Sequence, residues 1–321
     1  MVQVMRPTES GRWLGRPPER PARLRHPAHQ LVPELMVVSF MVLVMACSST
    51  QASPSAARPS VAPPTAVSSG PYLYWANWGN RHGTTIGRAN LDGTAANSSF
   101  ITGANAPCDV AVNRSYIYWG NNGTNSIGRA NLDGTAVNQH FIASTGSPCP
   151  LTVDRSHIFW GNWRKPASIG RANLDGTGVN ENFITGMTDV GDVVVNETYI
   201  YWTSHDSVTI GRANLDGTGV SQTFISVEST PDGMAIDDSH IYWTELDRGT
   251  IGRSDLDGTG VNNSFITGAN VPTGIKVDSG YIYWSEMGAN TISRANFDGT
   301  AANRRFITGA FFPTGLAMQL P

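Results

Sequence analysis

Glu245 and Glu286 occupy matching places in two neighbouring stretches of the chain, each two residues after a Tyr-Trp pair. Carboxylates brought together from adjacent repeats can act as a general acid and base or hold a cation such as Ca²⁺. His205 or His82 would then serve a metal-assisted lyase or hydrolase. No His–Glu arrangement recurs through the chain, however, so we favour binding over catalysis and keep this enzyme with a metal site as the alternative.

A second set of side chains, which are candidates for binding a partner, follows the aromatic-Trp pairs or lies near the end of the last repeat. Exposed Trp and Arg on loops are favoured interface anchors, so these residues predict a surface that binds a protein or glycan partner. The plainer interpretation is that Trp78 and Trp163 only cover a rim. The candidates are Trp78, His82, Trp163, Arg164, Lys165, His205, Asp206, Asp247, Arg248, Phe311 and Phe312.

Two of the three cysteines, Cys108 and Cys149, lie at equivalent positions 41 residues apart. In an oxidising exterior such thiols tend to pair, so we predict a disulfide between adjacent strands. Two free buried thiols are the alternative, expected if the Cα atoms are more than ~7 Å apart. No CxxC motif is present, so a structural zinc site is not supported.

The elements that carry these residues repeat six times. The repeated tryptophans are spaced 44, 41, 42, 41 and 41 residues apart, at Trp75, Trp119, Trp160, Trp202, Trp243 and Trp284. Each unit contains four short strand patterns, exemplified by 272–278, 281–284, 209–215 and 263–268, and an Asp-Gly turn joins the last two. The pattern "YIYW" is apolar on both faces, as expected of a sheet packed between two others. The sequence therefore predicts an all-β, six-bladed β-propeller over residues 71–321.

The two ends of this array complete each other. The first unit begins directly at "YLYW" (72–75), whereas the chain ends in a first-type strand around 315–318. We expect that C-terminal strand to complete the N-terminal blade, which leaves no long open edge. Each blade then has four antiparallel strands.

The tryptophan pairs followed by "IGRANLDGT" resemble the YWTD repeat of propellers of the low-density-lipoprotein-receptor class B type. The resemblance covers residues 72–318 and implies the six-bladed fold. The family's aspartate after Trp-Thr is absent at every matching position: Asn77, Asn121, Asn162, Ser204, Glu245 and Glu286. Cysteine-rich modules like those beside the receptor propellers are also absent, so receptor function and its partners are not carried over.

Comparison between repeats separates a uniform face from a variable one. The Asp-Gly turns are nearly identical, whereas the loops between second and third strands and between fourth and first strands differ. In an up-and-down blade these two variable loops emerge on the same face, which predicts recognition there. The arginine repeated in every third strand (Arg88 and its equivalents) is expected to bridge strands or blades through hydrogen bonds.

The N-terminal part of the sequence predicts a signal peptide followed by a tether. Residues 1–46 end in a short apolar run and "LVMAC", which resembles the lipobox of bacterial lipoproteins and implies lipidation of Cys47. The alternative is an ordinary cleaved signal peptide. Residues 47–70 are rich in Ser, Ala and Pro, as in a disordered tether. We therefore expect an extracytoplasmic protein held at the cell membrane by its lipid only.

Composition excludes one class of partner. With residues 1–46 set aside, 16 basic and 22 acidic side chains remain, and only two are lysines. No basic stripe is left for a phosphate backbone, so nucleic-acid binding is not expected.

Overall fold

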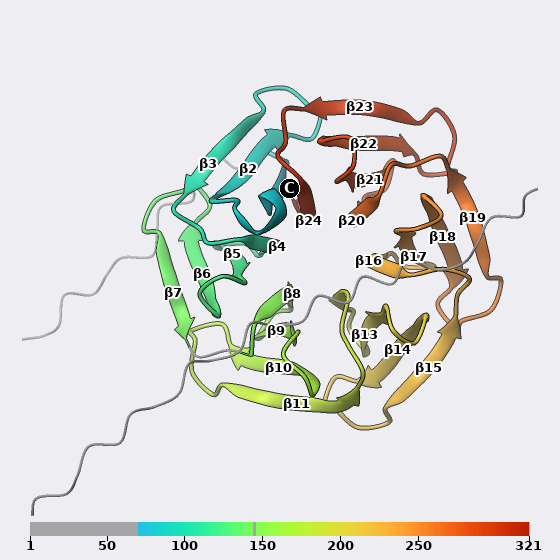
Figure 1. Cartoon of the computed structure of the whole chain (residues 1–321), viewed down its shortest axis with the longest axis horizontal. Helices are drawn as coiled ribbons and strands as arrows, with labels where there is room; N and C mark the ends of the chain where they lie inside the picture. Colours follow the sequence, from blue (N-terminus) through green and yellow to red (C-terminus); the bar gives the residue numbers. More distant parts are fainter. Residues whose placement is uncertain (1–69, 144–145, 321) are drawn as a thin grey trace, which may run out of the picture. The chain divides into compact units, whose positions relative to one another are not determined.

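The computed structural model describes residues 70–143 and 146–320. Their strands form six four-stranded sheets arranged as a ring of blades, so the predicted fold is confirmed (Figure 1). The predicted signal peptide, Cys47 and the tether up to residue 69 lie outside the described residues. No helix within the described ranges is long and apolar enough to cross a membrane.

In each blade the innermost strand is followed outward by the other three in chain order, except in the first blade. Blades one to three contain β24 (Pro313–Gln319), β1 (Tyr72–Asn77), β2 (Thr85–Asn90), β3 (Asn97–Thr102); β4 (Pro107–Val112), β5 (Tyr116–Asn121), β6 (Ser126–Asn131), β7 (Asn138–Ala143); β8 (Pro148–Val153), β9 (His157–Asn162), β10 (Ala167–Asn173), β11 (Asn180–Met187).

Blades four to six repeat the plan. They contain β12 (Val193–Val195), β13 (Tyr199–Ser204), β14 (Thr209–Asn214), β15 (Ser221–Ser226); β16 (Pro231–Ile236), β17 (His240–Glu245), β18 (Thr250–Asp255), β19 (Asn262–Thr267); β20 (Pro272–Val277), β21 (Tyr281–Glu286), β22 (Thr291–Asn296), β23 (Asn303–Thr308). A short 3₁₀ turn, η1 (Gly79–Arg81), follows β1.

The C-terminal strand closes the ring as the repeat arithmetic predicts. Strand β24 pairs antiparallel with β1, and Leu73 lies opposite Met318. The hydroxyl of Tyr74 donates a hydrogen bond to the side-chain carbonyl of Gln319 across this junction, at 3.1 Å. The first blade is therefore built from both ends of the propeller, so neither end leaves an open edge there.

Each repeated tryptophan is fully buried and lies opposite a small residue on the third strand. Trp202 pairs with Gly211, and a Cβ atom at Gly211 would lie 2.2 Å from Cε2 of the Trp202 ring. Glycine leaves room there for the indole to lie over the neighbouring backbone. The sixth blade has Ser293 at this position.

The repeated arginines do not serve mainly as the hydrogen-bond bridges expected from the sequence. In all six blades the guanidinium carbon lies 3.8–4.3 Å from the centre of the fourth-strand Phe ring. Arg88, for example, lies over Phe100, and a second, weaker contact joins it to the carbonyl of Leu132 at 3.4 Å. A planar cation favours such stacking over an aromatic face.

Hydroxyl groups link neighbouring blades near the axis. The hydroxyl of Thr203 donates to the carbonyl of Asp232 at 2.6 Å, and that of Thr244 donates to the carbonyl of Thr273 at 2.7 Å. Both donors directly follow the repeated tryptophan and point away from it, as alternation along a strand requires. These bonds fix the inner strands of adjacent blades relative to one another.

Candidate functional site

A cavity of about 200 Å³ lies among the innermost strands and the loops that follow the second strands. Its wall has two parts with a simple relation to the repeats. The loops contribute the third residue after the repeated tryptophan in five blades: Trp78, Trp163, His205, Leu246 and Met287. The inner strands and the two residues before β12 contribute Cys108, Asp109, Cys149, Pro150, Gly191, Asp192, Asp232, Gly233, Thr273, Gly274, Lys276, Thr314, Gly315 and Leu316.

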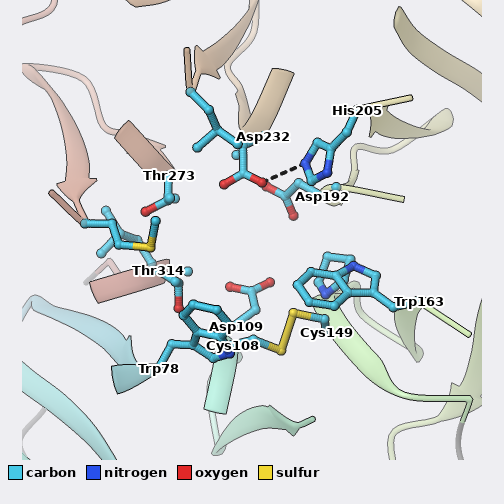
Figure 2. Close-up of a pocket in the computed structure, with 18 of the residues that line it drawn as sticks. Trp78, Cys108, Asp109, Cys149, Trp163, Asp192, His205, Asp232, Thr273 and Thr314 are labelled. Carbon is cyan, nitrogen blue, oxygen red and sulfur yellow. Dashed lines mark hydrogen bonds and ion pairs between the residues drawn. A yellow bond between two sulfur atoms is a disulfide. The ribbon is translucent and has the colours of Figure 1, made fainter. Parts of the chain in front are cut away.

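A repeated backbone bond explains why the loop residues converge. The amide of Trp163 donates to the carbonyl of Ser147 at 3.2 Å, and that of Leu246 donates to the carbonyl of Thr230 at 3.0 Å. In each case the acceptor directly precedes the proline that begins the inner strand. The amides of Trp78 and Met287 make the equivalent bond, whereas that of His205 donates to the Asp189 carboxylate at 2.8 Å. Figure 2 shows the side chains of Trp78 and Trp163 beside the central space.

His205 is held by carboxylates on both of its ring nitrogens. Its Nε2 lies 2.9 Å from Asp232 and its Nδ1 lies 3.5 Å from Asp189 (the first contact is dashed in Figure 2). Burial alone would lower the pKa of His205, but the bond and charge of Asp232, with the charges of Asp189 and Asp206, raise it above its ordinary value. The ring is therefore favoured as an imidazolium that neutralises nearby carboxylates.

Asp109 and Asp192 are buried carboxylates that join neighbouring inner strands. Asp109 accepts backbone N–H bonds from Val110 and from Leu151 of the next blade, at 2.8 and 2.7 Å. Asp192 repeats this arrangement with its own next residue and with Met234, both at 2.7 Å. Each side chain thereby ties two blades together while it faces the cavity.

Burial disfavours the ionised form of both of these carboxyl groups. Desolvation raises the pKa of Asp192 to about 6, although Lys276 and the backbone donors oppose the rise. Desolvation and the charge of Asp192 raise the pKa of Asp109 well above its usual range. A positive charge placed at the floor of the cavity would therefore stabilise the ionised form of both carboxylates.

Cys108 and Cys149 lie side by side in the wall, on β4 and β8. Their Cα atoms are 5.4 Å apart, within the range for a disulfide, and the structure joins their sulfur atoms (Figure 2). Their oxidation state in the protein stays a prediction with its own chemical test.

The structure brings three of the predicted partner-binding residues into one cavity: Trp78, Trp163 and His205. The others lie outside its wall. His82 and Arg164 are exposed. The remaining ones form local contacts: Lys165 pairs with Asp206 at 2.9 Å, Arg248 pairs with Glu228, Asp247 accepts a bond from Thr230 at 2.6 Å, and the rings of Phe311 and Phe312 meet at 5.5 Å.

The predicted metal ligands Glu245 and Glu286 do not line this cavity. Each is buried and accepts a hydrogen bond from its own blade's indole N–H, at 3.2 and 2.9 Å. Thr250 also donates to Glu245 at 2.9 Å, and Arg304 pairs with Glu286 at 3.0 Å. Among the residues that the structure describes, no group of three or more His, Cys, Asp or Glu could hold a metal ion. These contacts give both carboxylates a role in anchoring the tryptophan.

Sequence reasoning missed the inner-strand residues of the site. Asp109, Asp192, Asp232 and Lys276 were hidden because the first strands were interpreted as scaffold alone. A signal existed in the two residues that follow the equivalent first position of each inner segment, which differ between repeats: Cys-Asp, Cys-Pro, Gly-Asp (just before β12), Asp-Gly, Thr-Gly and Thr-Gly. Inner-strand residues that differ between repeats are candidates for side chains that face the axis.

Comparisons with known proteins bear on the fold. No protein-family model matches the chain, and no curated protein matches it. A solved structure of a nidogen–laminin complex contains a chain that is 20% identical, with a TM-score of 0.65, over 78% of this chain and 99% of that one. A streptogramin B lyase structure is 19% identical, with a TM-score of 0.57, over 77% of this chain and 87% of that one. At these identities the likeness supports the propeller architecture.

Proposed function

We propose that this protein is a binding module whose propeller recognises a partner, protein or glycan, through the variable loop face. The observation that carries the proposal is the convergence of five equivalent loop positions on one cavity, where they present two indoles, an imidazole and two aliphatic side chains. Trp78 and Trp163 are partly buried there and present aromatic surface at its wall. Aromatic anchors in a pocket are the usual centres of binding energy.

The state of the histidine favours binding over acid–base catalysis. A general base needs a nitrogen lone pair that faces its substrate. Both ring nitrogens of His205 face carboxylates instead, so this geometry suits it better to organise charge than to accept a proton from a substrate.

Proteins of this fold have both kinds of function. One similar chain was solved in a nidogen–laminin complex, and another is a streptogramin B lyase. The first makes a protein partner a reasonable expectation here, and the second makes the enzymatic alternative worth a direct test.

We further propose that the propeller acts outside the cytoplasm, attached by lipid at Cys47. The support is the apolar run and "LVMAC" before Cys47, followed by a tether rich in Ser, Ala and Pro. Metabolic labelling with palmitate should mark the wild type and leave Cys47→Ala unlabelled. Labelling that survives this substitution would count against the anchor.

The binding proposal is tested with residues 71–321 as a soluble head. The head is immobilised and exposed to a glycan panel and to an envelope extract, and bound material is identified by mass spectrometry. Trp78→Ala and Trp163→Ala should lose the captured species while their unfolding temperatures stay close to the wild type. Val220→Ala, an exposed change beside an Asp-Gly turn on the uniform face, should keep it. Retention by the Trp variants, or loss in the control, would refute the assignment of the face.

The alternative is a metal-assisted lyase or hydrolase with Ca²⁺ or another divalent ion at Glu245 and Glu286. It predicts calorimetric binding of the ion that is lost in Glu245→Gln and Glu286→Gln. Glu197→Gln, an exposed glutamate paired only with Arg155, is the matched control. Ion binding that is equal in all variants, or absent at millimolar concentration, would exclude the metal-assisted version at these residues.

A further inference from the structure

The cavity is surrounded by more carboxylates than cations. Asp109, Asp192 and Asp232 line it, and Asp189 stands behind His205. The cationic side chains are His205 and Lys276, and β8 and β24 contribute uncharged residues to the wall. His205 is engaged by Asp232 and Asp189, so Lys276 alone is left to balance the other two carboxylates.

Lys276 does not complete that balance by direct contact. Among the described residues, no ion pair within 4 Å joins Lys276, Asp109 or Asp192 to any opposite charge. Asp109 and Asp192 are each only 8% exposed and face the cavity. Two buried carboxylates without a cation in contact favour a ligand that brings one.

The rest of the wall fits the stem of a long cationic side chain. Trp78, Trp163, Leu246 and Met287 are apolar, and an indole face attracts a cation as well as an aliphatic chain. The volume of about 200 Å³ is below the ~300–1,000 Å³ of typical drug-sized sites. It therefore suits one side chain better than an extended ligand.

One further polar group points to a peptide. The indole N–H of Trp78 is buried and has no acceptor among the described residues, whereas that of Trp163 donates to the carbonyl of Val190 at 2.8 Å. A buried donor without an acceptor is costly, and a backbone carbonyl beside an inserted side chain would satisfy it.

Resting on the binding function proposed above, we propose that the axial cavity receives one lysine or arginine side chain of a protein partner. Asp192 and Asp109 hold its cationic head, and Trp78 and Trp163 contact its stem. A glycan in the same cavity would lack the positive charge. A preference for a charged over an uncharged probe therefore distinguishes a protein partner from a glycan.

The raised pKa of Asp192 adds a pH signature to this arrangement. An entering cation favours the ionised carboxylate, so binding near pH 6 should release protons and strengthen as pH rises from 5 to 7.5. Burial and the charge of Asp192 also raise the pKa of Asp109, so it should respond in the same direction. The other charged groups at the cavity are Lys276 and Asp232, which contacts His205, with Asp189 behind that ring.

The test uses the soluble head and two small probes, Nα-acetyl-lysine methylamide and Nα-acetyl-norleucine methylamide, in titration calorimetry at pH 7.5. The lysine probe should bind at least 10-fold more tightly than norleucine, which has the stem without the charge. Asp192→Asn should reduce that preference about 10-fold. Asp238→Asn is the matched control, because Asp238 is exposed and lies outside the cavity wall.

A second measurement keeps the proposal testable if Asp192→Asn does not fold. Calorimetry of the wild type at pH 6 in buffers of different ionisation enthalpy should show proton release with the lysine probe and none with norleucine. Equal affinity for the two probes, or no detectable binding of the lysine probe at ~50 mM, would overturn the cationic pocket. If the lysine probe does not bind but the head captures a partner through Trp78 and Trp163, the binding function still holds. If the lysine probe binds but no partner is captured, the cationic pocket holds and the binding function is refuted.

Discussion

The glycine opposite each repeated tryptophan gives the sharpest test of how the blades pack. Five blades have glycine there and the sixth has Ser293, so one substitution can be compared in two settings. At Gly211 an added Cβ would lie 2.2 Å from the Trp202 ring, where ordinary contact begins near 3.4 Å. The fully buried indole would have to move by about 1 Å into packed neighbours.

We expect Gly211→Ala to destabilise the propeller. Overpacking costs ~1–3 kcal/mol, and the reduced freedom of the unfolded chain offsets ~0.4–1 kcal/mol of this. The net loss of about 1–2 kcal/mol should lower the unfolding temperature by roughly 2–8 °C. Ser293→Ala should act in the opposite direction, because the buried Ser293 hydroxyl has no partner among the described residues and its removal should gain about 1 kcal/mol.

The assay is urea unfolding of the soluble head followed by tryptophan fluorescence, with calorimetry for the unfolding temperature. An unchanged or higher stability of Gly211→Ala would refute the steric reason for the glycine. A loss of stability in Ser293→Ala would show that its hydroxyl has a partner.

Three further predictions follow from the contacts between blades. Because the pKa of Asp192 is raised to about 6, the native state holds more protons than the unfolded state between pH 4 and 6. The free energy of unfolding of the wild type, measured relative to that of Asp192→Asn in urea titrations, should therefore fall by on the order of 2 kcal/mol as pH rises from 4 to 7. A difference that stays constant with pH would contradict this. Thr244→Val leaves the amide of Gly233 and a carbonyl of the next blade unpaired and should cost ~1–3 kcal/mol in the same titration, whereas Thr244→Ser should be nearly neutral. If Cys108 and Cys149 are bonded across 41 residues, reduction should destabilise the head by about 4 kcal/mol and peptide mapping should find both cysteines protected from alkylation; modification of both in the unreduced, folded protein would show free thiols instead.

The chemistry-bearing residues show where sequence reasoning was sufficient and where it was not. Trp78, Trp163 and His205 could be chosen because they stand out against a repeated background. Their convergence could not be derived, because it depends on tertiary bonds of the loop: the amide of Trp163 bonds to the residue before the inner strand, and that of His205 bonds to Asp189. The remaining loop candidates are equally distinctive in sequence, yet they lie outside the cavity wall.

Glu245 and Glu286 show a second limit of sequence reasoning. Their matching positions in adjacent repeats suggested that they meet, but an equivalent position also gives each one an equivalent local partner. Two residues after the tryptophan, a strand side chain returns to the same face as the indole and bonds with its N–H. The sequence contained the alternation but could not show that this bond would be the contact formed.

By itself, the sequence determined the number of blades, their four strands and the closing of the ring by the last strand. These follow from period, alternation and count, which are local properties repeated along the chain. Only the tertiary structure decided which side chains share the axis, because residues such as Asp109 and Asp192 lie 83 positions apart and face one cavity only when six sheets are arranged in a ring. The burial that raises their pKa also arises from that arrangement and from no feature of either residue's neighbours in sequence.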